Sequence, residues 1–366
     1  MNAVYVSNEN YARHLGVSLC SLYDRNREEK TLDVWIIDTG ISDLSRAKLK
    51  MIATGYGRLL RFCQLTDLRE RFRGELDTGS FDISTMGRLF VGELLPESAE
   101  RVLYLDCDTV VLRSLRKLWQ MPLDGAVMAA AQEPTIYPQV RDYLGLEADD
   151  AYYNAGVLLI DLKRWRAEGI REKVLAYYES IAEVSLFNDQ DALNGLLKGR
   201  IRTFSPEYNF FTNYRYFRYE TLCGMQSAYR EIPEKQFRLA KRHPAVLHFA
   251  GDERPWRAGA LNFYGAAYEK YLNMTPWAGT PKETGKELYL LAYHGMELMT
   301  VVSPGLRAAV SNAYVEKLIR ERQKRRAERE SAAEAEHTAG PESTAERESA
   351  AKPESAAETE NGGESR

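Results

Sequence analysis

About the first two hundred residues alternate between short apolar runs and amphipathic helical patterns, and this alternation limits the possible folds most strongly. Four apolar runs have the length and composition of buried strands: residues 3–7, 32–38, 58–65 and 101–105. Repeated strand-helix-strand units favour a mostly parallel sheet with right-handed crossovers and helices on both faces. The sequence therefore predicts an α/β fold built on a single mostly parallel sheet.

Helical patterns fill the intervals between these runs. The first begins near Tyr11, and Ser42 is a typical N-cap for a second helix that extends to Thr54. A third helix is expected at residues 85–95, where Pro96 follows and ends it. Three later elements continue the pattern: a strand at residues 154–160, a helix at 165–182 and a helix that opens at Asp189.

Asp106 and Asp108 directly follow the predicted strand at residues 101–105. Residues i and i+2 of a strand share a face, so both carboxylates leave the strand on the same side. Two carboxylates this close repel each other and lose hydration unless a cation lies between them. Parallel sheets bind ligands at the carboxyl ends of their strands, where Asn8 and Asn10 also fall. The pair indicates a divalent metal site; the alternative is a turn-capping Asp beside an unrelated solvated Asp.

Further polar residues occur where elements of the second half begin. Asn154 and Gly156 open a strand, and a glycine there lets the backbone come close to a ligand, although a plain turn would give the same pattern. The run Asp189-Gln190-Asp191 opens a helix. Acidic residues at a helix N-terminus also act as simple caps, so this run alone does not indicate a site.

His248 ends another strand-like run and is followed by Gly251 and Arg254. A lone histidine in an apolar run is more often a core residue than a ligand. Here, however, a flexible glycine and a cation follow it, and both suit a bound phosphate.

Composition limits the classes of partner. The 366-residue chain is 44% hydrophobic and has a formal net charge of -4. Residues 331–366 hold nine Glu against three basic residues and carry -6, which leaves the remainder at +2. A nearly neutral body gives no electrostatic reason to expect nucleic acid as a partner. The four widely spaced Cys are typical of a reducing compartment, and no basic and apolar leader follows Met1, so we expect a cytoplasmic protein.

An ordered set of five motifs spans about residues 3–260, with Arg88 before a helical run between the first two. The motifs are Tyr5-Val6-Ser7-Asn8-Glu9-Asn10-Tyr11, Leu103-Tyr104-Leu105-Asp106-Cys107-Asp108, Tyr153-Asn154-Ala155-Gly156-Val157, Asn188-Asp189-Gln190-Asp191-Ala192-Leu193-Asn194, and His248-Phe249-Ala250-Gly251 with Arg254-Pro255-Trp256. This set resembles glycosyltransferase family 8, which includes bacterial lipopolysaccharide galactosyltransferases, general stress protein A and glycogenin.

The resemblance implies a Rossmann-like nucleotide-sugar-binding fold of the GT-A type. It also implies a retaining transferase that moves galactose or glucose from a UDP-sugar to a hydroxyl of a glycan or glycolipid acceptor, in cell-surface polysaccharide biosynthesis. A divalent ion, Mn²⁺ or alternatively Mg²⁺, would be held by Asp106, Asp108 and His248 and would neutralise charge as the nucleoside diphosphate leaves.

The same resemblance implies roles for individual residues. The implied donor-binding residues are Val6, Asn8, Asn10, Tyr11, Arg88, Asp106, Cys107, Asp108, Asn154, Ala155, Asp189, Gln190, Gly251 and Arg254. Among them, Tyr11 is expected to stack on the uracil, and Gly251 and Arg254 to contact the diphosphate. The implied catalytic residues are Gln190, Asp189 and Arg88, with Asp189 reading sugar hydroxyls.

Three positions affect which of the family's residue roles apply to this chain. Many family members have Asp at the position of Asn8 and Lys at that of Arg254, and these exchanges alter base and phosphate contacts. By the resemblance, Gln190 is at the position that lies nearest the anomeric carbon in relatives, and a carboxamide is a poor nucleophile. We therefore favour same-face attack by the acceptor hydroxyl, with the leaving phosphate accepting its proton. The alternative function is a catalytically weak nucleotide-sugar-binding or scaffold protein.

The family motifs end near residue 270. We expect a catalytic domain at residues 1–270, a helical C-terminal extension at 271–330 and a disordered acidic tail at 331–366. The extension holds apolar stretches too short to span a bilayer, followed by a basic helical stretch at residues 314–329. This order fits two interpretations equally well: peripheral contact with an anionic membrane, on its inner face, or a C-terminal helix packed on the catalytic domain with a solvated basic end.

Overall fold

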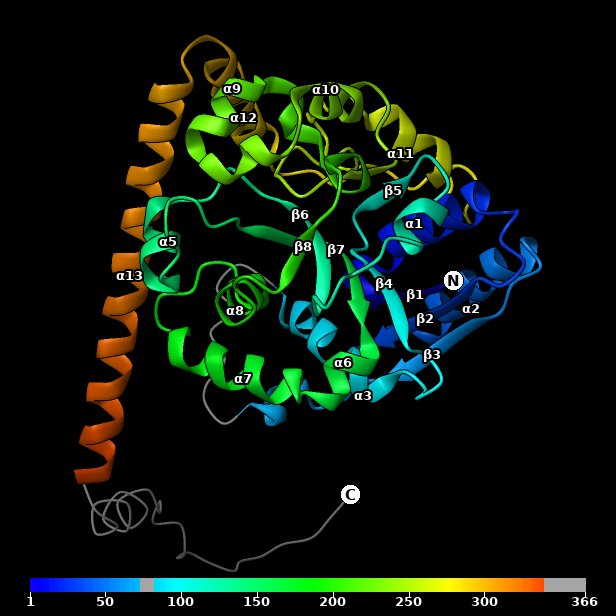
Figure 1. The fold of residues 1–366 in the computed structure, drawn as a ribbon, viewed down its shortest axis with the longest axis horizontal. Helices are drawn as coiled ribbons and strands as arrows, with labels where there is room; N and C mark the ends of the chain where they lie inside the picture. The colour runs from blue at the N-terminus through cyan, green and yellow to red at the C-terminus, as the bar shows by residue number, and fades with distance from the viewer. Residues whose placement is uncertain (73–81, 339–366) are drawn as a thin grey trace, which may run out of the picture. The chain divides into compact units, whose positions relative to one another are not determined.

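The computed structural model describes residues 1–72 and 82–338, which belong to two compact units, residues 1–317 and residues from 318 onward. A seven-stranded sheet in the order β3-β2-β1-β4-β7-β6-β8 lies at the centre of the first unit (Figure 1). Its strands are β1 (Asn2–Ser7), β2 (Asp33–Asp38), β3 (Leu60–Gln64), β4 (Arg101–Leu105), β6 (Met128–Gln132), β7 (Tyr153–Asp161) and β8 (Ile201–Thr203).

The sheet is parallel except at β7, which runs antiparallel to both of its neighbours, β4 and β6. The predicted mostly parallel sheet is thereby confirmed. Because β7 runs in the opposite direction, its first residues lie at the same edge of the sheet as the last residues of β4. Leu105 pairs with Val157, and the backbone N–H of Asp106 donates to the Gly156 carbonyl at 2.8 Å.

Both faces of the sheet are buried, as expected for strand-helix-strand units. Ala3 and Tyr5 of β1 contribute to one apolar cluster, whereas Val4 and Val6 contribute to the other. The first cluster also contains residues of α1 (Ala12–Arg25) and α2 (Asp43–Gly55). The second contains residues of α3 (Val91–Leu94), α6 (Leu162–Ala167), α7 (Ile170–Ile181) and α8 (Asp189–Leu196).

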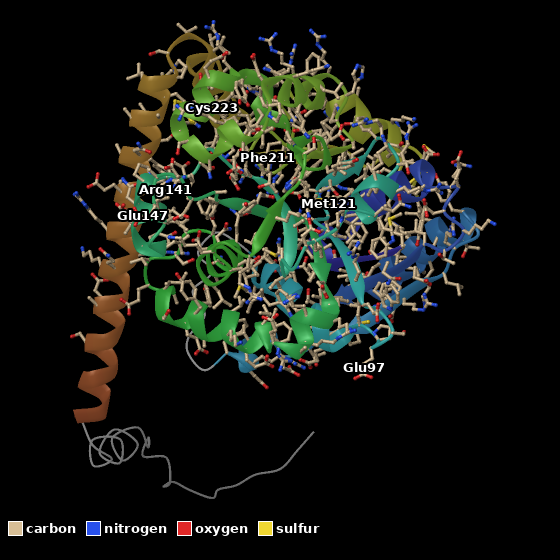
Figure 2. All side chains as sticks on the ribbon, in the orientation of Figure 1. Glu97, Met121, Arg141, Glu147, Phe211 and Cys223 are labelled. Atoms are coloured by element: carbon tan, nitrogen blue, oxygen red, sulfur yellow. The ribbon has the colours of Figure 1, made fainter. Side chains whose placement is uncertain are left out.

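A second, three-stranded sheet has the order β5-β10-β9, with β5 (Thr109–Val111), β10 (Val246–His248) and β9 (Phe210–Phe211). The antiparallel pairing of β10 with β5 places His248 opposite Thr109. Phe211, labelled in Figure 2, lies on β9 with its ring centroid 5.3 Å from that of His248. This small sheet therefore joins two segments that are about 140 residues apart in the sequence.

Two expected helices differ from the observed ones. The helix expected at residues 85–95 is a 3₁₀ helix, η3 (Ile83–Phe90), followed by α3. It begins earlier because the carboxylate of Asp82 caps it by accepting from the Ser84 N–H at 2.9 Å. The single helix expected at residues 165–182 is divided into α6 and α7, because Gly169 between them has a φ of 59°.

The remaining helices connect and extend these elements. The α-helices are α4 (Arg116–Trp119), α5 (Pro138–Leu144), α9 (Tyr219–Met225), α10 (Glu234–Arg242), α11 (Gly265–Leu272), α12 (Glu287–Val302) and α13 (Pro304–Thr338). The other 3₁₀ helices are η1 (Glu9–Tyr11), η2 (Leu68–Arg71), η4 (Pro206–Tyr208), η5 (Thr212–Tyr216) and η6 (Ser227–Glu231).

The C-terminal extension is helical, and α12 belongs to the same compact unit as the sheet. α13 continues to Thr338, so residues 331–338 are helical where the sequence predicts a disordered tail. Ala and Glu dominate this segment, and both favour helix. The rest of the predicted tail, residues 339–366, lies outside the described residues. Among the described residues, no helix is both long enough and apolar enough to cross a membrane.

Candidate active site

Asp106 and Asp108 lie in the short turn between β4 and β5. Asp106 continues the pairing of β4 with β7 by one residue, and Asp108 is buried. Cys107 between them points away from the carboxylates, and its thiol donates to the Val6 carbonyl at 3.1 Å. The turn thus presents two carboxylates on one side, and Cys107 anchors it to β1 on the other.

The pairing of β5 with β10 brings His248 to this turn. The imidazole Nε2 lies 3.2 Å from Asp108 Oδ1 and 3.8 Å from Asp106 Oδ2. The backbone N–H of Phe249 also donates to the Asp108 carbonyl at 3.0 Å. One ligand atom from each of Asp106, Asp108 and His248 lies within 4.8 Å of the others. The three residues that the family resemblance nominates as metal ligands therefore converge.

A chain of amide side chains fixes the tautomer of His248. The backbone N–H of Gly156 can only donate, and it bonds to Asn154 Oδ1 at 2.8 Å. Asn209 Nδ2 donates to the same oxygen at 2.9 Å, which leaves Asn209 Oδ1 facing His248 Nδ1 at 2.9 Å. Neutral His248 must then carry its proton on Nδ1, so that Nε2 directs a lone pair at the two carboxylates. Metal-bound histidines are commonly oriented in this way.

The charges of the cluster depend on one another. Burial acts to raise the pKa of Asp108, but His248 and Arg254 together lower it to about 2. Burial acts to lower the pKa of His248, yet Asp108 and Asp106 outweigh it and raise the net pKa above its usual value. The carboxylates thus favour a positive charge at this point. Two carboxylates and one imidazole lone pair form a donor set that fits a divalent cation.

Arg88 connects this cluster to α8. Its guanidinium lies 3.1 Å from Asp106 Oδ1 and 2.8 Å from Asp189 Oδ2, and it also donates to the Ala155 carbonyl. Burial raises the pKa of Asp189 to about 6, with Asp106 adding to this effect and Arg88 opposing it. Arg88 therefore holds two carboxylates at fixed positions along one side of the site.

Gln190 has all of its hydrogen-bonding capacity engaged. Its Oε1 accepts from the Ala155 N–H and from Asn154 Nδ2, both at 2.9 Å. Its Nε2 donates to Glu133 Oε2 at 2.9 Å and to the Tyr152 hydroxyl at 3.0 Å. The carboxamide is thus locked in one orientation, which agrees with the interpretation that it is no nucleophile.

Arg254 and Tyr11 lie on the other side of the metal-ligand cluster. Arg254 donates to the Tyr11 hydroxyl at 2.6 Å and to the Gly251 carbonyl at 3.1 Å, and its guanidinium lies 3.8 Å from Asp108 Oδ2. Asn8 lies at the end of β1 and donates to Asp82 Oδ2 at 2.7 Å. Asn10 lies in η1 and is exposed. The predicted donor-binding residues therefore lie on both sides of the turn.

A model of the family described as "Glycosyl transferase family 8" matches residues 2–260. The chain belongs to glycosyltransferase family 8. General stress protein A of Bacillus subtilis is 27% identical over 76% of this chain and 94% of that protein. A lipopolysaccharide 1,2-glucosyltransferase of Escherichia coli is also 27% identical, over 79% of this chain and 82% of that protein.

The solved structures similar to this family 8 chain include the galactosyltransferase LgtC in complex with donor and acceptor sugar analogs. LgtC is 26% identical, with a TM-score of 0.64, over 75% of this chain and 96% of LgtC. The family resemblance and the GT-A-like fold predicted from the sequence are thereby confirmed.

Two residues of this family 8 site were not predicted from the sequence. Asn209 follows a 3₁₀ helix and precedes two phenylalanines, and nothing in that context indicates a partner for a histidine. Glu133 directly follows β6, at the same edge of the sheet as Asp106. Its position just after a strand could have identified it as a candidate site residue. It accepts from both Asn154 and Gln190.

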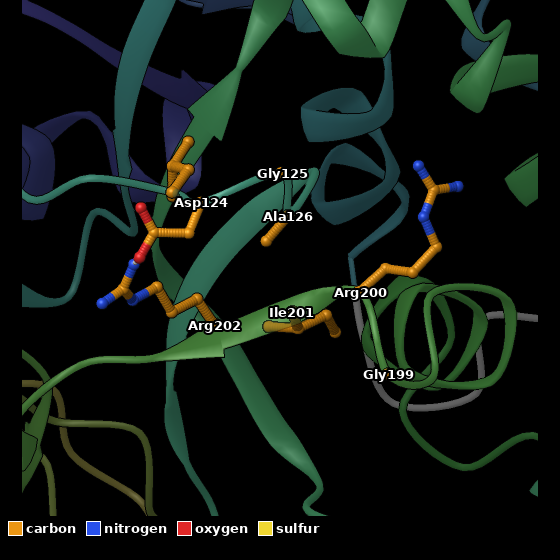
Figure 3. Close-up of a pocket in the computed structure, with 8 residues that line it drawn as sticks. Asp124, Gly125, Ala126, Gly199, Arg200, Ile201 and Arg202 are labelled. Carbon is orange, nitrogen blue, oxygen red and sulfur yellow. Dashed lines mark ion pairs between the residues drawn. The ribbon is translucent and has the colours of Figure 1, made fainter.

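A surface depression of about 440 Å³ lies elsewhere on the enzyme (Figure 3). Residues 123–126 and 199–202 line it, before and at the start of β6 and β8. Asp124 and Arg202 form an ion pair with each other there. Since β6 begins at the edge of the sheet opposite the Asp106 turn, this depression is not part of the candidate active site.

Proposed function

We propose that this family 8 glycosyltransferase transfers galactose or glucose from a UDP-sugar to a hydroxyl of a glycan or glycolipid acceptor, with retention of anomeric configuration. The observation that carries the proposal is the convergence of Asp106, Asp108 and His248, with the His248 lone pair directed at both carboxylates. These residues would hold Mn²⁺ or Mg²⁺, which when bound supplies positive charge for the leaving diphosphate.

Arg254 supplies a fixed positive charge beside that cluster. Its contacts with Tyr11 and Gly251 hold the guanidinium in place, and preorganised charge stabilises the negative charge that develops on the diphosphate. Tyr11 is proposed to stack on the base. Asn8 and Asn10 are proposed to contact the base and the ribose. Val6, Cys107, Asn154 and Ala155 contribute backbone and polar surface to the same donor site.

Asp189 and Gln190 are proposed to face the transferred sugar. Asp189, oriented by Arg88, accepts from sugar hydroxyls, and Gln190 is held rigidly beside the reacting carbon. The acceptor oxygen forms a bond to the anomeric carbon as the bond from that carbon to the phosphate oxygen breaks. The acceptor proton passes to the departing phosphate, so attack and departure take place on the same face of the sugar.

The test uses UDP-galactose and UDP-glucose with Mn²⁺ and compares the wild type with Asp108→Asn. We expect release of UDP from one donor, and a rate lower by more than ~100-fold in the variant, because an amide cannot replace the charged metal ligand. Undiminished release in the variant would contradict the mechanism. Binding of the donor without release of UDP, with acceptors present, would favour the alternative of a scaffold protein. Asn8 and Arg254, which differ from the residues that many family members have, motivate that alternative.

We further propose that the protein contacts an anionic membrane surface, on its inner face, through α12. Leu288, Leu291, Leu298 and Val302 lie on one side of this helix by their spacing, and all four are exposed. The sequence that follows carries six basic residues between Arg320 and Arg329. An exposed apolar stripe that is followed in the sequence by a basic segment suits a lipid-linked acceptor.

A further inference from the structure

A second group of metal-ligating side chains lies outside the candidate active site. Glu253 comes from the loop after β10, and His294 and Glu297 come from neighbouring turns of α12. One ligand atom from each lies within 4.8 Å of the others. Glu253 is 3% exposed and Glu297 is 7% exposed. The group therefore joins two elements in the interior and does not lie on a solvated acidic surface.

The orientation of His294 suits a metal ligand. Its Nε2 lies 3.1 Å from the Gly259 carbonyl, and a longer contact of 3.3 Å joins the same nitrogen to the Leu261 N–H. With the proton on Nε2, directed at the Gly259 carbonyl, Nδ1 has a lone pair; the Leu261 N–H fits the other tautomer, in which Nδ1 donates to Glu297. Nδ1 lies 2.9 Å from Glu297 Oε2. In the first tautomer a lone pair faces a carboxylate oxygen at this distance, and a cation between them would be bound by both.

The two carboxyl groups contact each other and the Tyr216 hydroxyl, but each keeps one oxygen without a partner. Glu253 Oε1 and Glu297 Oε1 are buried and have no hydrogen-bond partner among the described residues. No Lys or Arg nitrogen of the described residues lies within 4.0 Å of either carboxylate. The group thus holds two acidic side chains and one imidazole, and among the described residues no Lys or Arg forms a direct ion pair with them.

We propose that Glu253, His294 and Glu297 bind a second divalent transition-metal ion, of the class represented by Zn²⁺. Two carboxylates and one imidazole nitrogen are three protein ligands of a type that zinc accepts, and a divalent charge neutralises both carboxylates. The site is separate from the Asp106, Asp108 and His248 cluster. It depends only on this chain's own side chains and goes beyond the proposed sugar transfer.

The position of this second site gives it a structural role. Glu253 immediately precedes Arg254, the proposed diphosphate contact. α12 also contacts this loop through the Tyr289 hydroxyl, which donates to Asp252 Oδ2 at 2.8 Å, and through Tyr293, which packs against Gly251. A metal ion at Glu253, His294 and Glu297 therefore fastens α12 to the loop that positions Arg254.

The test measures Zn²⁺ binding to the full chain by equilibrium dialysis and metal analysis, in an Asp108→Asn background that weakens the first site. We expect one Zn²⁺ equivalent in this background. Adding His294→Ala should lower its affinity by more than ~100-fold, since a first ligand is lost. Adding Glu297→Gln should have a similar effect with little change in side-chain size. His243→Ala, which removes an exposed histidine, is the matched control and should change nothing.

Circular dichroism at the measuring temperature verifies that each variant is folded, and Glu297→Gln serves if His294→Ala does not fold. No Zn²⁺ uptake by the Asp108→Asn protein, or uptake that neither second-site change reduces, would overturn the inference. The readout is independent of sugar transfer. Inactivity with every UDP-sugar, together with a retained second Zn²⁺ site, would refute the proposed function alone.

Discussion

Gly156→Ala is the sharpest test of whether metal binding depends on the position of the His248 imidazole beside Asp108. A Cβ added at Gly156 would lie 2.2 Å from His248 Cε1 and 2.8 Å from Nδ1. Carbon atoms in contact are normally about 3.5–4.0 Å apart, so the imidazole must move by at least ~1 Å. Metal-ligand distances tolerate only about 0.2 Å of error. The methyl group should therefore displace Nε2 from its position 3.2 Å from Asp108 Oδ1.

Two effects of Gly156→Ala can be measured separately. Overpacking should lower the free energy of unfolding by about 1–3 kcal/mol, measured by denaturant titration without metal. Mn²⁺ affinity should fall by ~10–100-fold, measured by calorimetry on the folded protein. Gly224→Ala is the control, because an added Cβ there meets nothing within 4 Å. Unchanged Mn²⁺ affinity in Gly156→Ala would refute the role assigned to His248.

Three further predictions concern other parts of the protein. Asn209→Leu removes the acceptor for the Nδ1 proton of His248, so Mn²⁺ affinity should fall by ~10–100-fold in calorimetry, and an unaltered affinity would contradict the tautomer argument. The pKa of Asp189 is about 6 in the folded chain against an ordinary 3.8, so the folded state binds the proton more tightly. Metal-free denaturant titrations should therefore show the free energy of unfolding falling by about 2 kcal/mol more in wild type than in Asp189→Asn as pH rises from about 4 to 6, and parallel pH curves would argue against the shift. Anionic vesicles should sediment the wild type at low salt, and the double change Leu291→Glu and Leu298→Glu should abolish this; equal sedimentation of both proteins would exclude α12 as the contact.

The sequence predicts most of the sheet because apolar runs and helix caps are local signals. The strand at residues 101–105 and the N-cap at Ser42 occur as expected, and Ser42 accepts from the Ser45 N–H at 3.2 Å. Strand direction is not a local signal, since the same apolar pattern fits either direction. The reversal of β7, which brings Asn154 to the edge where Asp106 lies, therefore emerges only from the structure.

Long-range partners are the part of the site that sequence reasoning missed. The family motifs nominate His248 as a ligand, but they do not include Asn209, whose partner lies 39 residues away. Likewise, Glu253 lies between residues of one motif, and the sequence alone assigns it no role. Only the packing of α12 brings His294 and Glu297 beside it. Such contacts depend on how elements pack, and no single segment encodes them.

The central claim is that Asp106, Asp108 and His248 form the metal site that holds a nucleoside diphosphate. Calorimetric titration of UDP into the full chain, with and without Mn²⁺, tests this most directly. The account predicts UDP binding that Mn²⁺ strengthens by at least ~10-fold in the wild type, and no such strengthening in His248→Ala. UDP affinity that is independent of Mn²⁺, or that responds to Mn²⁺ equally in His248→Ala, would contradict it.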